Sequence, residues 1–505
     1  MSRKFPSRVD VAIVGSGPTG AAYARVLSEL RPDLELVSFE AGPLLADPPG
    51  LHVKNIADAE ERAAAQRRSE GLVASDSEDR RLRRAGTHLL PDGFQQPGED
   101  GIPSLAMSSN VGGMGAHWTA ACPRPGDSEV IGFIDNLDEL LDEAERLLGV
   151  STHAFDGAPF ADEVRARLGR AFDDSRPTGR KVQPMPLAVQ TRDDGRVTWS
   201  GSDVVYGDAT RSNPRHSLFP EAQVRVLRLE DGCVSGVVVR DLQDGTEHYV
   251  AAGQVVVAAD AVRTPQLLWA SGIRPRALGR YLNDQSQVIF AARLRDVVAA
   301  DAAEGKASGK PRIARQSGVS WVPFTDAEPF HGQVMQLDAS PVPLAPDDVV
   351  EPGSIVGLGW FCAKDLQETD RLEFDDEQTD AYGMPAIRVH YTLTDRDLAA
   401  LEQARQTVRK AAEALGEPLD ADPITLPPGA SLHYQGTARM GATDDGTSVC
   451  DPLSRVWGVD GLRVAGNGLI PTSTACNPTL TSVALAVAGA RDIASTYPKQ
   501  EGTLP

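Results

Sequence analysis

The sequence lacks the features of several large classes of protein. Its 505 residues contain no apolar run of 18, so we predict no membrane-spanning helix. The N-terminal stretch MSRKFPSRVDVAIVG has no long apolar segment that ends at a small-residue cleavage site, and we expect no secretory signal. Positive charge is scarce, with 50 Lys and Arg against 71 Asp and Glu. The net charge of −21 argues against nucleic acid and anionic lipid as partners.

Cysteine is also scarce. The five cysteines lie far apart, at positions 122, 233, 362, 450 and 476, and no CxxC pair occurs. An odd number at such wide spacing predicts free thiols and argues against a zinc site or a disulfide framework. We therefore expect a cytoplasmic protein with no metal site.

The first clear motif is a glycine loop between an apolar run and a helix-like stretch, within residues 8–27. Gly15 permits a tight turn, Gly17 lets the backbone approach a pyrophosphate, and Gly20 lets helix and strand pack closely. The N-terminus of the helix offers free N–H groups to the phosphates. The predicted phosphate-binding residues are Gly15, Ser16, Gly17, Pro18, Thr19 and Gly20.

Glu40 ends the next apolar run, LELVSFE, 20 residues after Gly20. A carboxylate at this place accepts hydrogen bonds from a ribose in dinucleotide-binding folds. Glutamate suits an adenosine without a 2′-phosphate, which favours FAD or NAD over NADP.

The rest of the chain predicts an α/β protein with two domains. Residues 137–149 place leucines on one helical face, and residues 222–259 alternate as strands do. Strand patterns between 315 and 393 indicate a separate antiparallel sheet. We predict a discontinuous, Rossmann-like nucleotide-binding domain (1–150, 215–290 and 430–505) and an α+β substrate-binding domain (151–214 and 291–429).

Two stretches near the C-terminus carry candidate catalytic residues, LHYQGTARMG at 432–441 and GNGLIPTSTACNPTLTSVALAVAGA at 466–490. His433 is a candidate base, and Asn477 is a neutral hydrogen-bonding partner for it. A helix begins after Asn477-Pro478-Thr479, where proline is favourable. Its free N–H groups suit a flavin carbonyl that gains negative charge on reduction.

Taken together, these motifs resemble the glucose–methanol–choline family of FAD oxidoreductases, and within it the pyranose oxidase branch. The stretches that carry the resemblance are VGGMGAHWT, TPQLLWASGI, LGRYLNDQ, PFHGQVMQLDA, TDAYGMPAIRVHYTLTD and CNPTLT. Asp260 departs from the pattern, because it stands where the family often has glycine. The resemblance runs from the first strand to the last helix and implies FAD as the cofactor.

By this resemblance, the flavin ring lies against residues 112–119. Gly112 and Gly113 allow its approach, and Thr119 stands where the branch places a hydroxyl near flavin N5. The resemblance also implies cofactor contacts from Trp118, Val224, Ala259, Asn467, Gly468 and Thr479.

His117 stands where the branch attaches its flavin covalently. Gly115 and Ala116 replace a serine and a threonine common in the branch, which removes polar support beside the histidine. Covalent and non-covalent FAD both stay open, and we predict the non-covalent form.

The predicted substrate-binding residues differ more from those typical of the branch. Gln333 matches a sugar-contacting glutamine, whereas Met335 and Leu337 stand at positions that tend to be polar. A more apolar pocket suits an aglycone or a different ring hydroxyl. The chain also lacks the length that many pyranose oxidases devote to an oligomerising arm, so we expect a monomer or a small homo-oligomer.

The resemblance implies oxidation of a ring hydroxyl, at C2 or C3 of a pyranose or of an O- or C-glycoside, to a ketone. His433 takes the hydroxyl proton, Asn477 hydrogen-bonds the same oxygen, and the hydride passes to flavin N5. Oxygen, giving hydrogen peroxide, or a quinone then reoxidises the flavin. The alternatives are a lyase resembling the hydroxynitrile lyases, a non-sugar alcohol dehydrogenase and a non-catalytic FAD-binding protein.

Overall fold

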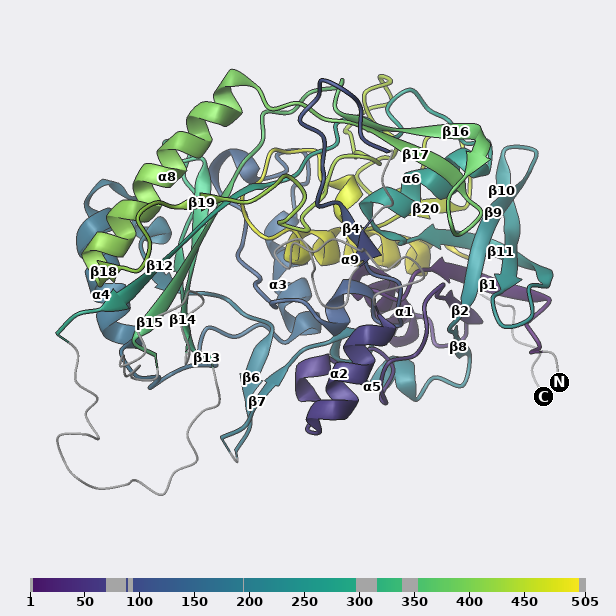
Figure 1. The fold of residues 1–505 in the computed structure, drawn as a ribbon. Helices are drawn as coiled ribbons and strands as arrows, with labels where there is room; N and C mark the ends of the chain where they lie inside the picture. Colours follow the sequence, from purple (N-terminus) through teal and green to yellow (C-terminus); the bar gives the residue numbers. More distant parts are fainter. Residues whose placement is uncertain are drawn as a thin grey trace.

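The computed structural model describes residues 3–69, 88–89, 94–193, 195–296, 316–337 and 353–498. One seven-stranded sheet has the order β8 (His216–Phe219), β2 (Leu36–Phe39), β1 (Arg8–Val14), β11 (Glu247–Val257), β10 (Cys233–Asp241) and β9 (Ala222–Glu230), with β20 (Leu462–Val464) beside β11 (Figure 1). β8, β2, β1, β11 and β20 pair in parallel. β9, β10 and the first half of β11 form an antiparallel meander. The glycine loop follows β1, at the edge where parallel strands end.

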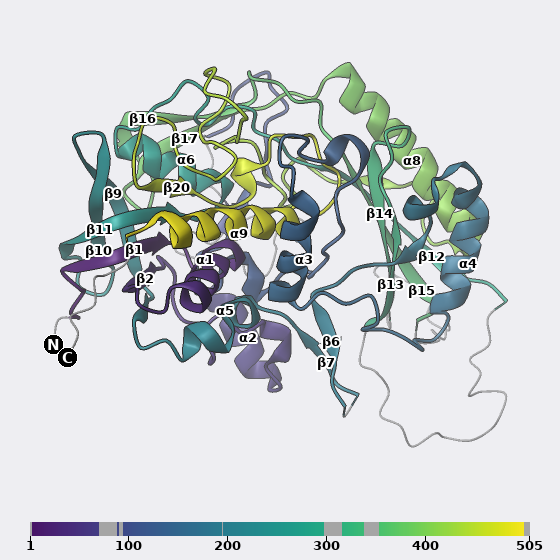
Figure 2. The ribbon, with the colours of Figure 1, turned by 180° about the vertical axis from the view of Figure 1, so that it is seen from behind.

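Four helices pack together beside this sheet, and Figure 2 shows two of them, α9 and α1, side by side. They are α1 (Pro18–Leu30), α3 (Leu137–Leu148), α5 (Ser202–Arg211) and α9 (Thr479–Thr496). All the apolar residues of α3 are buried, which confirms the amphipathic helix predicted over 137–149. α9 consists largely of buried alanine, valine and leucine, so it lies close against α1.

A second sheet is antiparallel throughout and lies at the other end of the molecule in Figures 1 and 2. Its order is β18 (Gly416–Pro418), β12 (Ser286–Leu294), β15 (Ile355–Cys362), β14 (Phe330–Leu337), β13 (Gln316–Val322) and β5 (Gln183–Pro184), with β19 (Ile424–Thr425) on β12. Two helices, α4 (Ala161–Phe172) and α8 (Asp395–Leu415), cover one face. Alternation along β14 sends Val334 into that core and leaves Gln333 and Met335 on the opposite face.

The described residues form two further α-helices and three two-stranded sheets. They are the helices α2 (Ala59–Arg68) and α6 (Asp260–Ala270), and the strand pairs β3 (His88–Leu89) with β4 (Ala106–Met107), β6 (Val189–Thr191) with β7 (Val197–Trp199), and β16 (Arg371–Thr379) with β17 (Pro385–His390). Among the described residues, no helix is both long and apolar enough to cross a membrane.

The predicted fold class is confirmed, because a Rossmann-like sheet and a separate antiparallel sheet are both present. The strands expected within 222–259 are β9, β10 and β11. All five cysteines are free thiols, as their spacing predicts. The domain boundaries given above stay a prediction.

Candidate active site

The glycine loop, residues 15–20, forms one wall of the phosphate cradle, and its backbone path requires glycine at positions 15 and 20. Gly15 has φ +105°, and a Cβ added there would lie 2.2 Å from the carbonyl oxygen of Ala258. A Cβ on Gly20 would lie 2.1 Å from the carbonyl oxygen of Gly15. Gly17 differs, because its added Cβ would meet no atom closer than 3.9 Å, at Gly113 Cα. Gly17 lines the central cavity, so a side chain there would take up ligand space without disturbing the fold.

Glu40 fastens the loop from the end of β2. Its Oε2 accepts hydrogen bonds from Ser16 N at 3.1 Å and Ser16 Oγ at 2.7 Å, and its Oε1 accepts from Gly42 N at 2.9 Å. Burial raises the pKa of this carboxyl group above its ordinary value, while these hydrogen bonds oppose the shift. Glu40 therefore holds the loop as well as lining the cavity.

A second glycine segment meets the first. Gly112 N donates to Ser16 Oγ at 3.0 Å, and a Cβ added to Gly113 would lie 3.0 Å from Gly17 Cα. Both Gly112 and Gly113 have positive φ, at +94° and +52°. The backbones of residues 15–17 and 112–113 thus pack directly against each other, and Gly17 and Gly113 form adjoining parts of one cavity wall.

His117 has a polar partner that the sequence interpretation missed. Its Nε2 lies 2.8 Å from Ser108 Oγ, and that hydroxyl donates to Asn110 Oδ1 at 2.7 Å. Because a hydroxyl carries one hydrogen, Ser108 Oγ accepts from the Nε2–H of His117. Burial lowers the pKa of His117 to about 4, so the ring is neutral at neutral pH.

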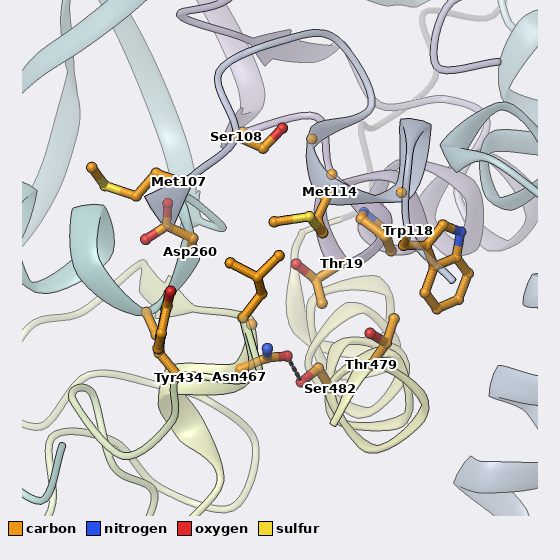
Figure 3. A pocket seen from close by; sticks show the side chains of 18 of the residues that line it. Thr19, Met107, Ser108, Met114, Trp118, Asp260, Tyr434, Asn467, Thr479 and Ser482 are labelled. Atoms are coloured by element: carbon orange, nitrogen blue, oxygen red, sulfur yellow. Dashed lines mark hydrogen bonds between the residues drawn. The ribbon is translucent and has the colours of Figure 1, made fainter. Parts of the chain in front are cut away.

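The next two residues, Trp118 and Thr119, differ in how firmly the protein holds their side chains. The indole N–H of Trp118 donates to the carbonyl oxygen of Ser200 at 2.8 Å, which fixes the ring. Thr119 is exposed and lines the cavity. Figure 3 shows Trp118 and Met114 on the same side of the pocket as Thr19 and Thr479.

The predicted catalytic pair is in contact. Asn477 Nδ2 lies 3.1 Å from His433 Nε2, although 44 positions separate the two residues in the sequence. Asn477 Oδ1 accepts a hydrogen bond from Gln333 Nε2 at 2.6 Å. The ring of Phe361 packs beside the imidazole, with centroids 5.2 Å apart. Three predicted substrate-side residues therefore meet at one point.

One cavity of about 430 Å³ contains most of the predicted site, from the glycine loop to the catalytic pair. Its lining includes Gly15, Ser16, Gly17, Pro18, Thr19, Glu40, Gly113, His117, Trp118, Thr119, Val224, Ala259, Gln333, His433, Asn467, Asn477 and Thr479. Three predicted residues lie behind this surface: Gly20, Gly112 and Gly468. A Cβ added to Gly20 would meet the carbonyl oxygen of Gly15, one on Gly112 would meet Gly50 Cα at 2.8 Å, and one on Gly468 would meet Thr437 Oγ1 at 3.0 Å. Close packing therefore explains these glycines better than ligand contact does.

The N-terminus of α9 also opens on the cavity. Thr479 is its first residue and Ser482 donates to Asn467 Oδ1 at 2.6 Å, the hydrogen bond drawn in Figure 3. The free N–H groups of the first turn therefore lie beside the lining residues, which suits a ligand carrying negative charge there.

Other lining residues were not predicted from the sequence, among them Met107, Ser108, Met114, Gln287 and Phe361. Gln287 and Phe361 stand opposite each other on β12 and β15 and so share the sheet face of Gln333. The alternation of these strands was a signal that could have found them. No comparable sequence pattern points to Ser108. Among the described residues, no cluster of acidic, histidine and cysteine side chains is arranged to hold a metal ion.

Comparison with known proteins places this site in a family. Models of the GMC oxidoreductase family match residues 199–287 and 369–486. The chain is 61% identical over 501 residues to a C-glycoside 3-oxidase of Arthrobacter globiformis, covering 97% of this chain and 96% of the relative. The chain belongs to the GMC oxidoreductase family.

One further relative and one solved structure are also similar to this chain. A pyranose 2-oxidase of Tricholoma matsutake is 33% identical over 539 residues, covering 96% of this chain and 93% of the relative. The solved structure of pyridoxine 4-oxidase from Mesorbium loti shares the fold with a TM-score of 0.67 at 20% identity, covering 97% of this chain and all of the other. The resemblance found in the sequence is confirmed, and membership of the family makes the chain an FAD-dependent oxidoreductase.

The residues present fit FAD. The open side of Gly17 and the neighbouring Gly113 leave a cradle that any larger side chain would fill. Glu40, His433 and Asn477 line this same cavity, and a carboxylate at the end of β2 suits the hydroxyl groups of a ribose. When bound, the flavin supplies a two-electron acceptor for a hydride.

Proposed function

We propose that the chain oxidises a secondary ring hydroxyl of a glycoside or pyranose to a ketone, with FAD as the hydride acceptor. The observation that carries this proposal is the contact of His433 Nε2 with Asn477 Nδ2, at 3.1 Å, in the cavity that also contains the phosphate cradle. The similarity to a C-glycoside 3-oxidase favours the C3 hydroxyl of a C-glycoside over the C2 hydroxyl of a free sugar.

His433 acts as the general base in this proposal. A neutral imidazole accepts the hydroxyl proton at Nε2 while the hydride leaves the carbon that bears this hydroxyl. The substrate thus loses two hydrogens and two electrons and becomes a ketone. Asn477 donates its amide hydrogen to the oxygen as negative charge develops there. A general base contributes about 10²–10⁴-fold and a neutral donor about 10²–10³-fold to such steps.

In this proposal, the residues that line the cavity make the contacts to the cofactor. The backbone of residues 15–19 and of Gly113 holds the pyrophosphate, with Gly20 and Gly112 packed behind it, and Glu40 holds the ribose. Val224 and Ala259 contact the adenosine, while Asn467 and Thr479 face the flavin, with Gly468 packed behind them. Trp118 and Thr119 complete the flavin side.

We propose that FAD is held without a covalent bond. His117 Nε2–H already donates to Ser108 Oγ, and Ser108 in turn donates to Asn110 Oδ1. A bond from Nε2 to the flavin would have to displace the first of these hydrogen bonds.

The substrate lies against the sheet face of Gln333, Met335 and Phe361 in this proposal. Gln333 gives a polar contact to a sugar, whereas Met335 and Phe361 offer apolar surface that suits an aromatic aglycone. The second substrate is oxygen or a quinone, and the protein is a monomer or a small homo-oligomer.

A panel of free sugars, O-glycosides and C-glycosides tests the function. Each compound is added to the yellow protein under nitrogen, and the product of any compound that bleaches the flavin is identified by NMR. The proposal predicts fast bleaching by a C-glycoside and a ketone at C3. A flavin that no sugar or glycoside reduces would contradict it and favour the lyase or the non-sugar alcohol dehydrogenase. Reoxidation of the bleached protein by air or by an added quinone then identifies the acceptor.

A further inference from the structure

The stretch LGRYLNDQ ends in two buried residues that lead to His433. Asp284 accepts hydrogen bonds from Gly429 N at 2.7 Å and Ser431 Oγ at 2.5 Å, and Ser431 Oγ in turn accepts from His433 N at 3.0 Å. Gln285 Oε1 lies 2.7 Å from His433 Nδ1. One residue thus anchors the backbone at His433 and its neighbour contacts the imidazole ring.

The orientation of the Gln285 amide follows from its other contact. Gln285 Nε2 lies 2.8 Å from the carbonyl oxygen of Cys476 and 3.3 Å from Thr474 Oγ1. A backbone carbonyl can only accept, so the NH₂ group must face Cys476 and the oxygen must face His433. An amide oxygen can only accept as well. The hydrogen of this contact therefore belongs to His433 Nδ1.

The tautomer of His433 in turn sets the orientation of the Asn477 amide. A neutral imidazole carries one N–H, so a hydrogen at Nδ1 leaves the lone pair at Nε2, which faces Asn477. Asn477 must then direct Nδ2 to His433 and Oδ1 to Gln333, which donates to it through Nε2 at 2.6 Å. The carbonyl of Cys476 thereby fixes the direction of every hydrogen bond from Gln285 to Gln333.

We propose that Gln285 is a positioning residue that holds His433 in the tautomer able to act as a base at Nε2. The proposal rests on the proposed function, because it assigns that role to His433. Without an acceptor at Nδ1, the other tautomer would place the hydrogen at Nε2 and turn the Asn477 amide around. The lone pair would then point away from Asn477 and from the substrate.

Two substitutions separate this role from a purely structural one. Gln285→Leu removes the acceptor at His433 Nδ1. Gln285→Glu keeps an acceptor there, loses the donations to Cys476 and Thr474, and adds a carboxylate charge beside the ring. The matched control is Gln266→Leu on α6, because Gln266 is as buried as Gln285, donates to the carbonyl oxygen of Pro385 at 2.6 Å and does not line the cavity.

The first measurement reads the tautomer without any turnover. The holoenzyme is labelled with ¹⁵N-histidine, and the signal of His433 among the nine histidines is assigned by its loss in His433→Gln. We expect the Nδ1–H tautomer in the wild type, in Gln285→Glu and in Gln266→Leu. Gln285→Leu should lose that signature. An unchanged tautomer in folded, FAD-loaded Gln285→Leu would overturn the proposal.

The second measurement is the limiting rate of anaerobic flavin reduction by the best substrate of the panel, compared at the pH optimum of each variant. Gln285→Leu should reduce this rate by roughly one to two orders of magnitude, less than removal of the base itself, and Gln285→Glu should recover most of it. Equal losses in the Leu, Glu and Gln266→Leu variants would overturn the positioning role. A tautomer shift without reduction of any sugar would instead contradict the proposed function and leave the positioning of His433 intact.

Discussion

Glu129 Oε1 accepts a hydrogen bond from Cys476 N at 2.9 Å, immediately before Asn477 in the chain. The same oxygen accepts from Ala475 N at 2.8 Å, and the other carboxylate oxygen accepts from Gly126 N at 3.0 Å. The side chain is buried, and burial raises its pKa above the ordinary value while these hydrogen bonds oppose the shift. A buried carboxyl group that does not itself line the cavity thus holds the segment that presents Asn477.

Glu129→Ala should loosen that segment and slow anaerobic flavin reduction by about tenfold or more, because a misplaced amide no longer stabilises the developing charge. Glu129→Gln should lose less, since an amide oxygen can still accept from Ala475 and Cys476. FAD content should stay near one per chain in both variants. Stopped-flow reduction and the flavin absorbance measure the two quantities. Equal rates in the wild type and Glu129→Ala would show that the segment needs no such anchor.

Gly17→Val should fold and yet fail to retain FAD. The new Cβ would meet no atom within 3.9 Å, so the backbone is undisturbed, but the side chain would occupy the pyrophosphate cradle. Gly179→Val is the matched control, because a Cβ there meets nothing within 4 Å and the residue does not line the cavity. Flavin absorbance after gel filtration gives the result. Stoichiometric FAD in Gly17→Val would refute the location of the phosphate site.

Acid precipitation tests the attachment of the flavin. We expect the yellow colour to wash out of the denatured wild-type pellet, because Ser108 Oγ engages His117 Nε2 in the folded protein. His117→Ala should behave the same in this assay. A yellow wild-type pellet beside a white His117→Ala pellet would demonstrate a covalent bond at His117.

His331 is expected to lower the stability of the fold in acid. It is fully buried behind Phe361, and neither ring nitrogen has a hydrogen-bond partner among the described residues. Burial lowers its pKa from 6.5 to about 3. Between these values only the unfolded chain binds the proton, so this contribution to stability is complete above pH 6.5 and is lost as the pH falls toward 3.

His331→Leu should therefore lose less stability on acidification, by about 2 kcal/mol between pH 6.5 and pH 5. The measurement is the drop in unfolding midpoint temperature between pH 7 and pH 5 at a fixed FAD concentration. His153→Leu is the control, because that side chain is 79% exposed. An unchanged drop in His331→Leu would show that His331 does not cause the acid sensitivity.

Much of the fold could be predicted because it follows from residue patterns within short stretches of the sequence. The glycine spacing of residues 15–20 fixes a turn and a helix start, and the leucine period of 137–149 fixes α3. The proposed catalytic pair, His433 and Asn477, was predicted from the motifs around it, and the structure brings the two side chains into contact. Gln285 and Ser108 were not predicted, because their roles depend on contacts formed by tertiary packing. Gln285 meets Cys476 across 191 positions of the chain, and no local pattern reports such a contact.

Stopped-flow anaerobic flavin reduction at several pH values shows whether His433 is the base and Asn477 its partner. His433→Ala should slow reduction by about 10²–10⁴-fold at neutral pH, and Asn477→Ala by about 10²–10³-fold, with FAD content unchanged in both. The His433→Ala defect should shrink at high pH, where hydroxide partly replaces the base. A His433→Ala protein that reduces its flavin within about threefold of the wild-type rate at neutral pH would show that His433 is not the base, since a general base contributes far more than that.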